Sequence, residues 1–227
     1  MTGLSTDEAA EIRAPVVSVW DLPIRLVHWA IAALIPFSWW TAHHDHLPWH
    51  RLSGYVLLGL LAFRLIWGFA GSSTARFSRF LRGPVAIGAY LRGRLPAVVG
   101  HNPLGGWSVV AIFAALALQI GLGLFSIDED GFEAGPLSKF ISFDASRAVA
   151  RIHHLTFYVL LALIAVHLAA VALYAVRGRN LTGPMITGRT RLAPGVPPPR
   201  MAGAWRILPA ALAAAALAWF VAHGLRF

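Results

Sequence analysis

The chain alternates long apolar segments with short polar connections. Four apolar segments, at residues 24–40, 50–69, 107–125 and 151–176, are long enough to cross a bilayer core of about 30 Å as helices. A fifth segment, at residues 207–223, is rich in alanine and contains a proline. The pattern predicts an all-α integral membrane protein, a four-helix transmembrane bundle with an additional C-terminal helix.

Three regions follow from this pattern. Residues 1–16 form a polar N-terminal tail, residues 17–191 form the bundle, and residues 192–227 hold a proline-rich linker and the additional helix. Proline-rich linkers favour an extended chain, so the additional helix either spans the membrane or lies in its interface. Because the start of the chain carries acids and no apolar stretch, we expect no cleavable signal peptide and an insertion signal in the first span.

The composition excludes several kinds of cofactor site and argues against nucleic-acid binding. The chain is 57% hydrophobic and 13% charged, and it has no cysteine, which excludes thiolate-held iron–sulfur clusters, disulfides and covalent CxxCH heme attachment. The net charge of +9 comes from arginines beside apolar spans, so membrane topology explains it better than nucleic-acid binding.

Charge in the connections predicts the orientation. Residues 71–106 carry five arginines and no acid, whereas residues 126–149 carry five acids against one lysine and one arginine. Cytoplasmic loops retain basic residues, so we expect residues 71–106 and the N-terminus on the cytoplasmic side. The acidic connection then faces outward.

Four histidines occupy membrane-span positions, where ionisable side chains are costly and usually functional: His28, His50, His153 and His167. With the N-terminus inside, His28 lies near the inner surface and His50 near the outer one. On the fourth span His153 is near the outer surface, and His167 is fourteen residues, or about 21 Å, deeper. The histidines therefore pair by depth, His50 with His153 and His28 with His167, as two hemes stacked across a membrane require.

The spacing from His167 also favours His153 over His154 as the ligand. Fourteen residues are two heptads, which place His153 and His167 on one helix face, whereas His154 is rotated by roughly 220° from His167. A single membrane histidine can also be a hydrogen-bonding core residue or a proton relay.

Other residues at the two levels suit a heme. Arg25 is one turn before His28, and Arg64 is a charge inside an apolar span, so both are candidates to neutralise heme propionates. Gly54, one turn after His50, leaves room for a flat macrocycle. The alternatives are ordinary flanking charges for the arginines and helix packing for the glycine.

Six stretches, in order, resemble the bacterial cytochrome b561 family, whose members are diheme four-helix cytochromes related to the b-type subunits of nickel–iron hydrogenases. They are PIRLVHW, WHRLSGYVLLGLLAFRLIWGF, GHNPLGGW, GPLSKFIS, the HH…VHLAA segment and NLTGPMITGR, within residues 17–191. The resemblance implies that His28 and His167 ligate an inner heme b and that His50 and His153 ligate an outer one. It also implies a bacterial inner-membrane protein, and it gives no role to residues 192–227.

Bis-histidine ligation leaves no open coordination position at the iron, so such hemes suit electron transfer. The resemblance implies exchange with quinone, and we expect electrons to pass between the quinone pool and a periplasmic partner such as a c-type cytochrome. Three alternatives stay open: a membrane-anchor subunit of a dehydrogenase or hydrogenase, a superoxide:quinone oxidoreductase, and a heme-free transporter with histidine proton relays. Whether the chain is itself an enzyme stays open with them.

Two connections carry further candidates. The acidic residues 128–133 are either a docking surface for a basic periplasmic protein or a solvated loop. His101 and Asn102, in GHNPLGG, either contact a cofactor or quinone or cap the third helix.

Overall fold

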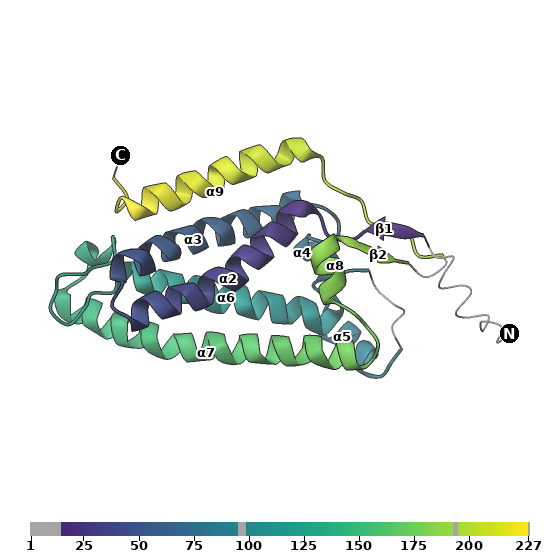
Figure 1. The fold of residues 1–227 in the computed structure, drawn as a ribbon, viewed down its shortest axis with the longest axis horizontal. Helices are drawn as coiled ribbons and strands as arrows, with labels where there is room; N and C mark the ends of the chain where they lie inside the picture. Colours follow the sequence, from purple (N-terminus) through teal and green to yellow (C-terminus); the bar gives the residue numbers. More distant parts are fainter. Residues whose placement is uncertain (1–14, 95–98, 193–194, 227) are drawn as a thin grey trace.

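The computed structural model describes residues 15–94, 99–192 and 195–226. Five long helices, all apolar enough to cross a membrane, dominate these residues (Figure 1). They are α2 (Leu22–His43), α3 (Leu47–Ala70), α6 (Pro103–Phe125), α7 (Phe143–Val176) and α9 (Ile207–Ala222). The predicted all-α membrane bundle is confirmed. The expected N-terminal tail lies outside the described residues, apart from residues 15 and 16.

Polar side chains fix where the spans begin. The carboxylate of Asp21 and the amide oxygen of Asn102 each accept a hydrogen bond from the backbone N–H three residues on, at 3.0 and 2.7 Å. Ser142 caps α7 in the same way, and Asp144 lies in the first turn, where the helix dipole favours an acid. These polar residues start α7 eight residues before the apolar segment that predicted it.

The bundle has two unlike ends (Figure 1). At the sheet end, β1 (Val16–Ser18) pairs antiparallel with β2 (Arg189–Arg191) next to α8 (Thr182–Thr187). At the loop end, residues 126–142 connect α6 to α7 and include the 3₁₀ helix η1 (Ser138–Phe140). The short helices α4 (Phe77–Phe80) and α5 (Pro84–Leu91) follow α3 at the sheet end. Hydropathy gave no signal for the two strands, which are only three residues long.

The core lies between the helices and is made of branched and aromatic side chains. The helix pairs α2–α3, α6–α7 and α3–α9 pack against each other. Leu61, Leu116 and Leu160, from α3, α6 and α7, are almost completely buried. Much of α7 instead presents exposed apolar side chains, such as Leu155 and Val166, which suits contact with lipid.

Helix α9 runs alongside α3 from the sheet end to the loop end (Figure 1). Gly59 of α3 faces Ala218 of α9, and such small residues allow transmembrane helices to approach closely. Arg206 donates to the carbonyl of Ala70 at 2.9 Å, near the start of α9, and Lys139 donates to the carbonyl of Gly224 at 2.7 Å, near its end. Attachment at both ends favours a spanning helix over one lying in the interface, because the two ends of α9 reach the two ends of the bundle.

Candidate functional site

At the loop end, His50 of α3 and His153 of α7 face each other. Their ring centroids are 6.1 Å apart, with the ring planes at 80°. The Nδ1 atom of His50 donates to the carbonyl of Ser38 on α2, and that of His153 donates to the carbonyl of Gln119 on α6, each at 2.9 Å. A carbonyl on one ring nitrogen fixes the tautomer and makes Nε2 the nitrogen able to bind a metal. At His153 this atom accepts from the side-chain amide of Gln119 at 3.3 Å, a contact that a metal would replace.

Three residues near this pair, His154, Gly123 and Gly54, differ in how closely they approach the two rings. His154 is exposed and hydrogen-bonds neither carbonyl. A Cβ added at Gly123 would lie 3.0 Å from Cε1 of His153, so this glycine lets α6 approach the ring. A Cβ added at Gly54 would meet no heavy atom within 4 Å. There is room at the position that the sequence pattern proposed for a macrocycle.

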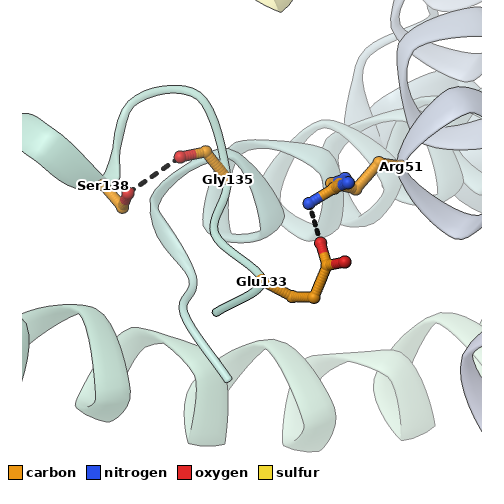
Figure 2. Close-up of polar contacts among 4 residues, drawn as sticks. All are labelled: Arg51, Glu133, Gly135 and Ser138. Carbon is orange, nitrogen blue, oxygen red and sulfur yellow. Dashed lines mark hydrogen bonds and ion pairs between the residues drawn. The ribbon is translucent and has the colours of Figure 1, made fainter. Parts of the chain in front are cut away.

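Two arginines at the loop end lie close to acids of the connection between α6 and α7. Arg51 forms an ion pair with Glu133, in a connection that Ser138 helps to fold by donating to the carbonyl of Gly135 at 2.8 Å (Figure 2). Arg147 lies 3.7 Å from Glu129. Two acids of the outer connection are thus paired with arginines, which weakens the expected acidic docking surface.

At the sheet end, His28 of α2 and His167 of α7 lie within range of an electrostatic interaction. Unlike the loop-end rings, His28 has a buried Nδ1 with no hydrogen-bond partner among the described residues. The structure thus brings together both pairs of histidines that were matched by their predicted depth in the membrane. It holds the two pairs in different ways.

The two candidate arginines are both at the sheet end. Arg64 is only 4% exposed, and its guanidinium lies over the rings of Phe77 and Phe113, at 5.4 and 5.3 Å. Arg25, in the first turn of α2, donates to the carbonyl of Ile186 in α8. Each arginine keeps one buried nitrogen without a partner in the described part of the chain, NH1 of Arg64 and Nε of Arg25. Arg25 is half-buried, but Arg64 is a buried cation without an ion-pair partner in the described residues, which is costly, so an anionic group fits here.

A further histidine, His101, joins this end. Burial lowers its pKa to about 3, and the positive charges of Arg64, His167 and His28 act in the same direction. Its ring packs against Trp20 and Phe80, with centroids 4.8 and 4.7 Å away. The sequence did not match His101 with another histidine, because the depth argument applies only within spans. His101 lies in a connection, and the position of a connection depends on the fold. Its place directly before the cap of α6 was the available clue.

Asn102 resolves one of the open alternatives, since its side chain caps α6. The same side chain donates to the hydroxyl of Tyr174 at 2.8 Å, and Tyr174 also hydrogen-bonds Tyr90 of α5. Burial, followed by this hydrogen bond, raises the pKa of Tyr90 to about 12. Tyr90 is therefore neutral at physiological pH and acts as a hydrogen-bonding group.

The donor set favours heme over a bare metal ion. Within residues 15–94, 99–192 and 195–226, no three His, Cys, Asp or Glu side chains are grouped to hold a metal ion. A heme needs only axial ligands from the protein, and a histidine pair provides two. A helical membrane bundle with histidines on facing helices is the arrangement of a membrane cytochrome.

Comparison with protein families gives the same class. The chain matches the family described as prokaryotic cytochrome b561 over residues 19–188, three quarters of its length, and it belongs to this family. No curated protein and no solved structure matched the chain. Membership makes it a multi-pass membrane protein that binds b-type heme and acts in electron transfer.

Proposed function

We propose that the chain is a diheme cytochrome that conducts electrons across the bacterial inner membrane between quinone and a periplasmic redox partner. The observation that carries the proposal is the presence of two histidine pairs at opposite ends of one bundle. His50 and His153 would ligate one heme, and His28 and His167 the other. Each heme would supply a reversible one-electron carrier with no open coordination position.

The protein's own groups would prepare these positions. The carbonyls of Ser38 and Gln119 orient the loop-end rings, and Gly54 and Gly123 leave space beside them. The apolar helices around both pairs exclude water, which favours outer-sphere electron transfer over proton-coupled side reactions. Arg25 and Arg64 would offset the negative charge of the sheet-end cofactor.

We place the quinone at the sheet end. A cavity of about 270 Å³ opens there, lined by residues that include Trp20, Arg25, Arg189 and Met201. Arg25 is one turn from His28, so a quinone headgroup in this cavity would lie close to the sheet-end level. The lining combines hydrogen-bonding and charged groups, among them Asp21 and Thr187, with the apolar side chains of Trp20, Leu22 and Met201, and this mixture suits a polar ring on an isoprenoid tail.

The same proposal places the N-terminus and the sheet end in the cytoplasm. The described part of the arginine-rich connection, residues 71–94 and 99–102, lies at the sheet end, and the acidic connection lies at the loop end. Because the chain has no cysteine, single introduced cysteines test this directly. In sealed spheroplasts, E129C should react with an impermeant maleimide and R92C should not. The reverse labelling would overturn the orientation.

Electron exchange tests the function. The purified protein in nanodiscs should be low-spin by absorption and paramagnetic resonance, and an added quinol analogue should reduce its hemes without oxygen. M201W, which narrows the cavity, should slow that reduction several-fold and leave reduction by dithionite unchanged. Low-spin hemes that no quinol analogue reduces would reject the quinone assignment. High-spin hemes would reject bis-histidine ligation.

A further inference from the structure

The sheet end holds more cationic and donor groups than the protein satisfies. Buried nitrogens of Arg25, His28, Arg64 and His101 have no hydrogen-bond partner among the described residues. The nearby carboxylate, Asp21, accepts from the backbone N–H of Ile24 at 3.0 Å and from Nε1 of Trp67 at 2.9 Å. In the described part of the chain, no ion pair within 4.0 Å joins Arg64 to an acid. An anion from outside the protein would complete this set.

Arg64 cannot reach water to satisfy itself. It is 4% exposed, lies inside the span of α3, and has Phe77 and Phe113 against its guanidinium. Asp21 lies within electrostatic range of Arg64 but not within ion-pair distance. A buried charge without a contact partner is costly, so the guanidinium is expected to have one in the working protein. The free NH1 atom marks the side from which the partner would come.

The residues before and after His101 both make contacts that hold it at the sheet end. On one side Gly100 lies against Thr74, whose hydroxyl donates to the carbonyl of Val19 at 2.6 Å. On the other side Asn102 donates to Tyr174 of α7, the helix that carries His167. The segment from Gly100 to Asn102 is thus clamped between two parts of the bundle. The imidazole of His101 is fixed within electrostatic range of Arg64, His28 and His167.

We propose that Arg64 and His101 together bind a carboxylate, and that this carboxylate is a propionate of the heme held by His28 and His167. The inference rests on the proposed function. A guanidinium and a neutral imidazole N–H are both donors to carboxylate, and the charged donor gives the stronger bond. A heme at this level carries its carboxylates into an apolar layer, where each needs such donors.

Redox titration of the purified holoprotein tests the proposal. Removing a positive charge beside a heme favours its oxidised form, because that form carries the additional positive charge. In R64L the one-electron reduction constant of the sheet-end heme should therefore fall about tenfold, which is 59 mV for one electron. H101L should shift the same wave in the same direction by a smaller amount, since it removes a donor and no charge. The sheet-end wave is the one that H28A abolishes.

Three controls isolate the effect. The loop-end wave of the same samples should not move. R64K should recover most of the wild-type potential, and R79L, which removes an exposed arginine near the same end, should leave both waves in place. If R64L does not fold, R64K and H101L carry the test.

Heme with its two propionates methylated distinguishes the source of the carboxylate. With this ester in place of heme, H101L should no longer shift the sheet-end wave relative to the wild-type chain, whereas R64L should still shift it, because the guanidinium charge acts on the iron directly. An H101L shift that persists with the ester, or one that follows the chloride or acetate concentration, would assign the anion to solvent and overturn the proposal. If H28A abolishes neither wave and H101L abolishes one, His101 is an axial ligand, and the proposal is overturned too.

Failure of the proposal is distinguishable from failure of the proposed function. Two bound hemes whose potentials are unaffected by R64L and H101L would reject this inference alone. A wild-type chain that binds no heme would reject both.

Discussion

The loop-end and sheet-end histidine pairs belong to one bundle but are held differently. At the loop end, Nδ1 of both His50 and His153 is bound by a backbone carbonyl, and the nearby cation Arg51 is paired with Glu133. At the sheet end, His28 has no such anchor, and buried nitrogens of Arg25 and Arg64 have no partner among the described residues. The loop-end rings are oriented by protein alone. The sheet end would be completed only by an anionic cofactor.

This contrast has a consequence for assembly. Rings that are already oriented lose little freedom when a ligand binds, so the loop-end site should bind heme readily. A heme at the sheet end would in addition neutralise buried charge and should stabilise the fold there. The two levels should therefore respond differently to substitution.

The largest expected effect comes from removing a loop-end ligand. H153A should lower the heme content from two to about one per chain, because the remaining axial ligand cannot hold a bis-histidine heme. The exposed neighbour provides the matched control, since H154A should retain both hemes. A pyridine hemochrome assay on the two variants measures this. Loss of heme in H154A and retention in H153A would reverse the ligand assignment.

Filling the space at Gly54 should have the next largest effect. G54L places a branched side chain one turn from His50, where no heavy atom lies within 4 Å of an added Cβ, and should lower loop-end heme occupancy several-fold. G54A, a smaller addition, should have little effect. Unchanged spectra in G54L would show that this space faces lipid and would remove Gly54 from the site.

A smaller effect is expected from S38A. The hydroxyl of Ser38 lies 3.1 Å from Nδ1 of His50, but the carbonyl of the same residue accepts from this nitrogen at 2.9 Å. Only the weaker contact is lost, so the cost should be about 1 kcal/mol. Chemical unfolding followed at the heme band should show it, with both hemes retained. Loss of the loop-end heme would mean that the hydroxyl, and not the carbonyl, orients the ring.

The smallest effect should come from E133Q. The ion pair with Arg51 is about one-third exposed on each side, and such pairs contribute about 0.2–1 kcal/mol. The thermal midpoint should fall slightly at low salt and less at high salt, without a change in either heme potential. A clear shift of the loop-end potential would show that Arg51 acts on the cofactor.

Much of this arrangement was predictable from sequence, because membrane spans leave a strong hydrophobic signal and heptad spacing fixes a helix face. Fourteen residues between His153 and His167 were enough to prefer His153 over His154, and the structure places the ring of His153 against that of His50. The pairing across helices followed from depth alone.

What the sequence could not provide depends on contacts between distant segments. The carbonyls of Ser38 and Gln119 are backbone atoms, which no residue type reveals. His101 reaches the sheet-end level only because Thr74 and Tyr174 hold its neighbours from two sides. The start of α7 was placed late because its first turns are polar.

The stoichiometry of heme in the wild-type chain tests the central claim most directly. Protein purified in mild detergent should contain two noncovalent b hemes per chain by pyridine hemochrome assay against quantitative amino-acid analysis. Redox titration of the same sample should resolve two one-electron waves. One heme per chain would contradict the claim that both histidine pairs bind heme.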